Sequence, residues 1–139
     1  MRRAIGTLAL LSILLLAIAP AVLAARPSTG FTGSWVAIDP LDGSNLSADI
    51  SGDTTTQIVY TDDNATNACE GASTAVFTSI LIGKVDGDEM FTTMTVAKCG
   101  TQPLGFHGLQ IGWTFHANGL GSADDTLTNT FDEVYTRAD

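Results

Sequence analysis

Apolar and polar residues alternate in short runs along most of the chain, and clusters of Gly, Asp, Asn and Pro separate the runs. Over residues 109–116, for example, apolar side chains occupy every second position and fall on one face of an extended segment. A period of two residues is typical of a half-buried β-strand. Beyond residue 25, no stretch repeats apolar residues at helical spacing over three turns. The pattern therefore predicts an all-β protein.

Eight strands are expected, and Gly, Asp and Asn mark the turns between most of them. They cover residues 31–38, 46–51, 55–61, 74–83, 90–98, 108–116, 125–129 and 133–137. Residues 85–88, Val-Asp-Gly-Asp, are a strong hairpin signal, whereas residues 62–73 and 100–106 are expected to form longer loops. Mostly short connections favour an eight-stranded antiparallel up-and-down barrel, which leaves no exposed sheet edge. A two-sheet β-sandwich is the alternative.

The first 24 residues have the three parts of a secretory signal peptide. Arg2 and Arg3 precede an apolar run over residues 4–18, and small residues at Val22 and Ala24 suit cleavage before Ala25. The apolar run has about 15 residues, fewer than the roughly 20 that a membrane-spanning helix needs. We therefore expect a single domain over residues 25–139, secreted or periplasmic and without a membrane anchor.

Cys69 and Cys99 are the two cysteines of the chain. In an exported protein such a pair is most simply a disulfide, and free thiols or a metal pair are the alternatives. The close Cys-x-x-Cys spacing of thiol-redox sites is absent. A bond between them would close a loop of about 31 residues and stabilise the fold by roughly 3–4 kcal/mol.

The charge balance excludes several classes of partner. Fifteen Asp and Glu stand against six Lys and Arg, and the formal net charge of −9 becomes more negative when Arg2 and Arg3 leave with the signal. Such a chain repels nucleic acid and anionic membrane surfaces. The carboxylates fall mostly in turns, which favour Asp for backbone capping. The best calcium candidate is the group Asp39, Asp42, Ser44 and Asn45, but no calcium-loop pattern is complete, so no metal is expected.

The sequence lacks the residue patterns of common hydrolytic sites. The two histidines are His107 and His116, and His116 lies on the polar face of its expected strand, near a turn. No serine lies in a Gly-x-Ser-x-Gly elbow, and no His-x-x-x-His pair is present. We therefore expect a protein that is not an enzyme and needs no cofactor.

The two ends of the expected barrel resemble those of a known group of families. Gly33-Ser34-Trp35 matches the Gly-x-Trp signature in the first strand of the calycin families, which include lipocalins and avidins. In those families an Arg from the final strand packs across the Trp, and Arg137 stands at that place here. The resemblance implies a small calycin-like barrel closed at one end by a guanidinium stacked on an indole. The biotin-binding residues of avidins have no matched counterparts here, so biotin binding is not implied.

Two functions are compatible with this barrel. The first is binding of a small apolar or amphipathic ligand in a cavity, because small barrels can hold one such molecule. The candidate lining residues are the aromatic and methionine side chains Tyr60, Phe77, Met94, Trp113 and Phe115. The alternative is a filled core, with the loop of residues 62–73 contacting a protein partner. A bacterial inhibitor of secreted metalloproteases has a similar architecture, a small exported eight-stranded barrel with one disulfide.

Overall fold

The computed structural model describes residues 30–105, 108–118 and 123–138. These residues form nine strands and no helix. The strands are β1 (Gly33–Ile38), β2 (Asn45–Ser51), β3 (Thr55–Asp62), β4 (Phe77–Asp86), β5 (Glu89–Cys99), β6 (Gln102–Pro103), β7 (Gln110–His116), β8 (Thr126–Asn129) and β9 (Val134–Arg137). The expected signal peptide and His107 lie outside the described residues.

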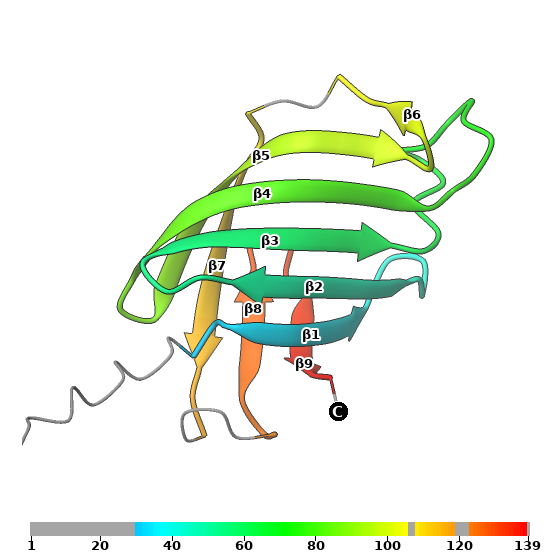
Figure 1. Ribbon diagram of the computed structural model, residues 1–139. Helices are drawn as coiled ribbons and strands as arrows, with labels where there is room; N and C mark the ends of the chain where they lie inside the picture. Colours follow the sequence, from blue (N-terminus) through cyan, green and yellow to red (C-terminus); the bar gives the residue numbers. More distant parts are fainter. Residues whose placement is uncertain (1–29, 106–107, 119–122, 139) are drawn as a thin grey trace, which may run out of the picture.

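Eight of the described strands close into an antiparallel up-and-down barrel. The order of hydrogen-bonded neighbours is β4-β3-β2-β1-β9-β8-β7-β5, and pairing of β4 with β5 closes the ring. In Figure 1, β1–β5 run across the view, and β7–β9 cross behind them at a steep angle. The two-residue β6 pairs only with the end of β5, within the segment expected to be a loop. The predicted barrel is confirmed, and the two-sheet alternative does not apply.

The β4–β5 hairpin differs from its predicted bounds. β4 begins at Phe77, three residues later than expected, because the Thr74 hydroxyl accepts a hydrogen bond from the Val76 backbone N–H (3.2 Å) and keeps this segment in the preceding loop. β4 then extends to Asp86, which pairs with Glu89 across a two-residue turn. Gly87 supplies the positive φ, 61°, that such a turn requires at its first central position.

Inward and outward side chains alternate along the strands, with one interruption in β5. Ile80 of β4 pairs with Val96, but the next residue, Leu81, pairs with Met94, so Thr95 has no partner across the ladder. This β-bulge lets Met94 and Ala97 both face inward although they are three residues apart. The Thr95 hydroxyl donates a hydrogen bond to the Ile80 carbonyl (3.1 Å) at the same place.

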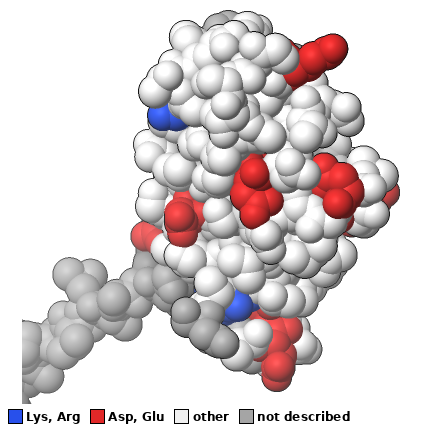
Figure 2. Space-filling model, turned by 90° about the vertical axis from the view of Figure 1, so that its right-hand side faces the viewer, with Lys and Arg blue, Asp and Glu red and all other residues white. Residues whose placement is uncertain are grey.

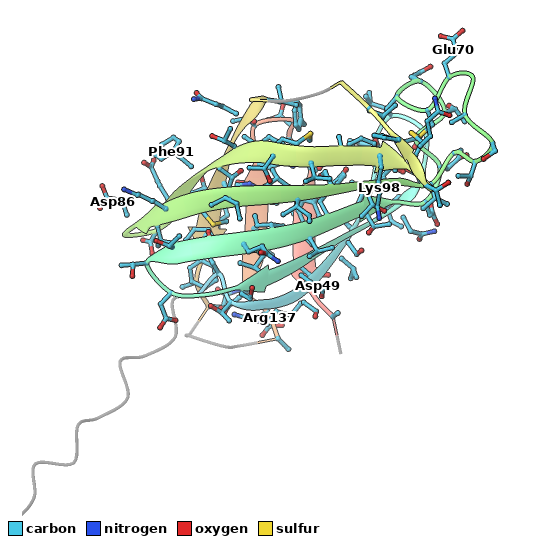
Figure 3. All side chains as sticks on the ribbon, turned by 45° about the horizontal axis from the view of Figure 1, so that its top comes forward. Asp49, Glu70, Asp86, Phe91, Lys98 and Arg137 are labelled. Atoms are coloured by element: carbon cyan, nitrogen blue, oxygen red, sulfur yellow. A yellow bond between two sulfur atoms is a disulfide. The ribbon has the colours of Figure 1, made fainter. Side chains whose placement is uncertain are left out.

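Among the charged side chains of the surface, Asp and Glu prevail over Lys and Arg on the face shown in Figure 2. Figure 3 shows Phe91 and Lys98 of β5 pointing away from the barrel, with Asp86 at the tip of the β4–β5 hairpin. Phe91 is 64% exposed.

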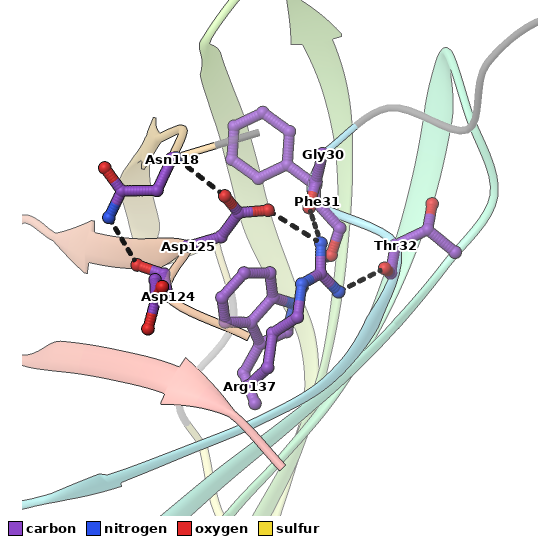
Figure 4. A network of polar contacts seen from close by, with 8 residues as sticks. Gly30, Phe31, Thr32, Asn118, Asp124, Asp125 and Arg137 are labelled. Atoms are coloured by element: carbon purple, nitrogen blue, oxygen red, sulfur yellow. Dashed lines mark hydrogen bonds and ion pairs between the residues drawn. The ribbon is translucent and has the colours of Figure 1, made fainter. Parts of the chain in front are cut away.

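One end of the barrel is closed by Trp35 and Arg137, which are paired across β1 and β9. The Trp35 side chain is fully buried, and its Nε1–H donates to the Phe31 carbonyl at 2.7 Å. The guanidinium carbon of Arg137 lies 4.3 Å from the indole centroid. The same guanidinium donates to the carbonyls of Gly30 (2.8 Å) and Thr32 (3.2 Å), as Figure 4 shows. The predicted contact between Trp35 and Arg137 is therefore confirmed.

A buried carboxylate balances the Arg137 charge at this closed end. Asp125 is fully buried, and its Oδ2 lies 3.6 Å from an Arg137 nitrogen (Figure 4). The other oxygen, Oδ1, accepts a hydrogen bond from the Asn118 backbone N–H at 2.8 Å. A buried charge is tolerated when it is paired and hydrogen-bonded. The ion pair thus ties the segment before β8 to the last strand.

The predicted disulfide between Cys69 and Cys99 is present, with Cα atoms 5.6 Å apart. Both half-cystines are buried. Cys99 is the last residue of β5, and Cys69 lies in the loop of residues 63–76 that joins β3 to β4. The bond therefore pins this long loop against the end of the barrel opposite Trp35.

Candidate functional site

The interior is packed near Trp35 but hollow toward the other end. A cavity of about 320 Å³ lies where β3 and β5 end and β4, β7 and β9 begin. In Figure 1 this is the end formed by the right-hand ends of β1–β5 and the upper ends of β7–β9. The cavity is lined by Asp39, Pro40, Leu41, Tyr60, Asp62, Ala65, Ala68, Phe77, Met94, Leu109, Ile111, Trp113, Asn129, Phe131 and Glu133.

Four of the five candidate ligand-binding residues line this cavity. Tyr60, Phe77, Met94 and Trp113 come from β3, β4, β5 and β7, so different parts of the wall contribute one side chain each. Phe115 faces inward but does not line the cavity, because it lies two residues further along β7, toward the closed end. There it packs against Phe31 and Trp35, with ring centroids 5.7 and 6.3 Å away.

Hydrogen bonds and ring contacts hold the aromatic wall in place. The rings of Tyr60 and Phe77 meet edge to face at 6.1 Å. The Trp113 Nε1–H donates to the Thr92 hydroxyl at 3.1 Å, and that hydroxyl donates to the Ile111 carbonyl at 2.9 Å. Since both polar groups are buried and satisfied, the indole is fixed against the cavity without an unpaired donor.

Three exposed apolar side chains that were not expected from the sequence form a rim around the cavity. They are Leu41, Leu109 and Phe131, which are 93%, 44% and 52% exposed. Each belongs to a connecting segment rather than to a strand. For Leu41 and Phe131 the available signal was a large apolar residue inside an otherwise polar turn, because clustered exposed apolar surface marks binding sites more often than chance. Leu109 instead shares the apolar face of the expected strand 108–116.

Glu133 is a further lining residue that was not expected from the sequence. Its side chain is only 7% exposed, and its Oε2 accepts hydrogen bonds from the Asn129 amide (2.6 Å) and from the Tyr135 hydroxyl. The Tyr135 hydroxyl also contacts the hydroxyl of Tyr60. Glu133, Tyr135 and Arg137 share one face of an extended segment, so the inward position of Arg137 was the signal that Glu133 faces the interior.

Burial favours the neutral, protonated forms of Glu133, Tyr60 and Tyr135. Burial raises the pKa of the Glu133 carboxyl above its ordinary 4.5; hydrogen bonds from Tyr135 and Asn129 lower it, and the nearby charges of Asp39 and Asp62 raise it. Burial likewise raises the pKa of the Tyr60 and Tyr135 hydroxyls, so both remain protonated at neutral pH. The cavity thus combines hydroxyl donors with carboxylates, and no Lys or Arg is among its described lining residues.

The carboxylates of the calcium candidate cap the turn that contains them. Asp39 accepts a hydrogen bond from the Leu41 N–H (2.7 Å), and Asp42 accepts one from the Ser44 N–H (2.9 Å). Among the described residues, no group of three or more His, Cys, Asp or Glu side chains is arranged to hold a metal ion. His116 is exposed and shares a hydrogen bond with the Thr128 hydroxyl at 3.0 Å.

The chain was compared with protein-family models, with curated proteins and with solved structures, and nothing matches it in any of the three comparisons. Within the ranges that the structure describes, no helix is long and apolar enough to cross a membrane.

Proposed function

We propose that the protein is a non-enzymatic binding protein of calycin-like architecture that holds one small apolar or amphipathic molecule in its cavity. The observation that carries the proposal is the 320 Å³ space lined mostly by apolar side chains at one end of an otherwise packed barrel. This volume is at the lower end of the roughly 300–1,000 Å³ of small-molecule sites. The exposed apolar rim of Leu41, Leu109 and Phe131 gives the ligand an entry surface.

A catalytic role fits the same cavity less well. None of the described lining residues is a Ser, Cys or Lys, which are common nucleophiles, or a His, the commonest general base. Glu133 accepts two hydrogen bonds within the barrel, which suits a group that positions a ligand. We therefore propose binding without turnover and without a cofactor.

A location outside the cytoplasm is part of the proposal. The buried Cys69–Cys99 disulfide supports it, because such bonds persist in oxidising compartments. The Arg pair and apolar run of residues 1–24 have the composition of an export signal.

Native mass spectrometry of the oxidised protein, isolated gently from the cells that produce it, tests the proposal. We expect an adduct on the order of a few hundred daltons that leaves on denaturation, as befits a cavity of this volume. The matched variants are Ala68→Phe, which places a ring in the cavity, and Ala117→Phe, which places one on an exposed position beyond β7. Only Ala68→Phe should lose the adduct.

The competing function is a protein-interaction or inhibitor module that docks through the rim. A bare mass for the wild-type protein, together with a protein partner that binds wild type and Ala68→Phe equally, would favour it. The reason is that Ala68→Phe fills the cavity but leaves Leu41, Leu109 and Phe131 in place.

A further inference from the structure

The cavity wall is divided into an apolar side and an acidic side. Three carboxylates line it: Asp39 directly follows β1, Asp62 ends β3, and Glu133 directly precedes β9. In the barrel β9 pairs with β1, β1 with β2, and β2 with β3, so the three residues come from one continuous part of the wall. Phe77, Met94 and Trp113 belong to β4, β5 and β7 and supply apolar surface from the other part.

No basic side chain neutralises these carboxylates in the described part of the molecule. None of the described lining residues is a Lys or Arg. Lys84 and Lys98 are exposed on the outside of β4 and β5, and Figure 3 shows Lys98 pointing away from the barrel. Arg137 is paired with Asp125 at the closed end. The negative charge at the cavity therefore has no basic partner among the residues that the structure describes, unlike the buried charge of Asp125 at the closed end.

Glu133 is positioned to bind a ligand directly. It is nearly fully buried, it lines the cavity, and both of its side-chain hydrogen bonds within the described residues end on Oε2. Oε1 is therefore left to accept a hydrogen bond from a molecule in the cavity. Because the Asn129 amide and the Tyr135 hydroxyl fix the other oxygen, the carboxylate is held in one orientation, which reduces the entropy lost on binding.

We propose that the cavity selects an amphipathic amine: a cationic ammonium group bound by Glu133, with Asp62 and Asp39 nearby, and an apolar body packed on Phe77, Met94 and Trp113. This inference rests on the proposed binding function and names its ligand class. An ammonium group provides the charge that the acidic side lacks and donates the hydrogen bond that Oε1 accepts. An anionic amphiphile would meet like charges and be rejected.

Isothermal titration calorimetry of the oxidised protein with three matched probes tests the inference: octylamine, octanol and octanoate at neutral pH. The three share one alkyl chain and differ in head group, so their affinities separate apolar burial from charge recognition. We expect octylamine to bind about tenfold or more tightly than octanol. A hydrogen bond to a charged group stabilises a complex more than a neutral one does, and the difference in free energy corresponds to about a tenfold change in affinity. Octanoate should bind most weakly.

Single substitutions show which carboxylate causes the preference for octylamine over octanol. Glu133→Gln should lower the octylamine affinity far more than the octanol affinity, so that the two probes bind about equally well. Asp86→Asn removes one charge at the hairpin tip, at the far end of β4 from the Phe77 side of the cavity, and should change neither affinity (Figure 3). If Glu133→Gln does not fold, Asp62→Asn provides the same comparison, because Asn keeps the oxygen that caps the Asn64 N–H.

The outcomes separate the inference from the proposed function. If octylamine and octanol bind equally well, or if octanoate binds most tightly, the amine selectivity is overturned and the binding function stands. If none of the three probes binds, the proposed binding function fails, and the inference fails with it.

Discussion

Trp35 is fully buried where the first and last strands meet, and its indole contacts both the Phe115 ring and the Arg137 guanidinium. We predict that Trp35→Ala lowers the free energy of unfolding by about 3–5 kcal/mol, because it leaves a large cavity in the packed half of the barrel. Urea denaturation measures the loss. Val36→Ala, at the neighbouring half-exposed outward position, should cost less than about 1 kcal/mol. A comparably small loss for Trp35→Ala would show that the closed end contributes little to stability.

Glu133 should make stability depend on pH. Its raised pKa means that the folded protein holds this proton at a pH where the unfolded chain, with a pKa near 4.5, has released it. The stabilising contribution is therefore complete below pH 4.5 and is lost as pH rises through the folded-state pKa. Glu133→Gln carries no titrating group, so its stability relative to wild type should increase across this range and then level off.

Thermal unfolding of both proteins in steps from pH 4 to pH 8 checks this prediction. The charges that face Glu133 are Asp39 and Asp62, and the hydroxyls are those of Tyr60 and Tyr135. Those groups remain in both proteins, so the difference between the two curves isolates the carboxyl. If the difference in stability between the two proteins stays constant with pH, the pKa of Glu133 is not raised in the folded state.

At the scale of elements, the loop of residues 63–76 depends on the disulfide for its position. Cys69 joins it to Cys99 at the end of β5, and Ala65 and Ala68 of the same loop line the cavity. We predict that Cys69→Ala/Cys99→Ala lowers the free energy of unfolding by about 3–4 kcal/mol, from the chain entropy gained by the unfolded state. Ligand binding should weaken as well, because part of the cavity wall loses its anchor.

Denaturation together with NMR chemical shifts tests both parts of this prediction. The barrel should persist in the double variant, since Cys99 keeps its backbone pairing with Phe77. Shift changes confined to residues 63–76 and their neighbours are expected. A loss below about 1 kcal/mol would mean that other contacts hold the loop, and that the bond constrains the unfolded chain less than the loop-length argument requires.

The eight strands of the barrel and their order were predictable from the sequence, but which side chains of β5 face inward was not. Thr and apolar residues occur on both faces between Met90 and Lys98, so alternation alone does not predict which face of the strand points into the barrel. The unpaired Thr95 changes the parity within the strand, and such a bulge depends on the partner strand. The start of β4 was misplaced for a related reason, because the hydrogen bond from Val76 to Thr74 that keeps residues 74–76 in the loop competes with their strand propensity.

At the scale of the whole molecule, the barrel divides into a packed half and a hollow half, and the sequence predicted only part of the hollow one. Tyr60, Phe77, Met94 and Trp113 could be selected as aromatic or methionine side chains in strands. Leu41 and Phe131 were missed because they lie in connecting segments, which meet only once the barrel closes. Leu109 and Glu133 stand at the starts of the expected strands 108–116 and 133–137, but they are neither aromatic nor methionine. Phe115 has the same residue type and parity as the lining residues, and only its depth along β7 separates it from the cavity.

This division also places the two tryptophans of the chain in different surroundings. Trp113 borders the cavity, whereas Trp35 is sealed behind Arg137 and Phe31. Trp35→Phe would leave a single indole whose fluorescence responds to what occupies the cavity. Trp113→Phe would leave only Trp35, whose emission reports whether the closed end of the barrel remains packed. The protein thus carries two intrinsic optical probes, one for occupancy and one for the integrity of the fold, and neither requires a label.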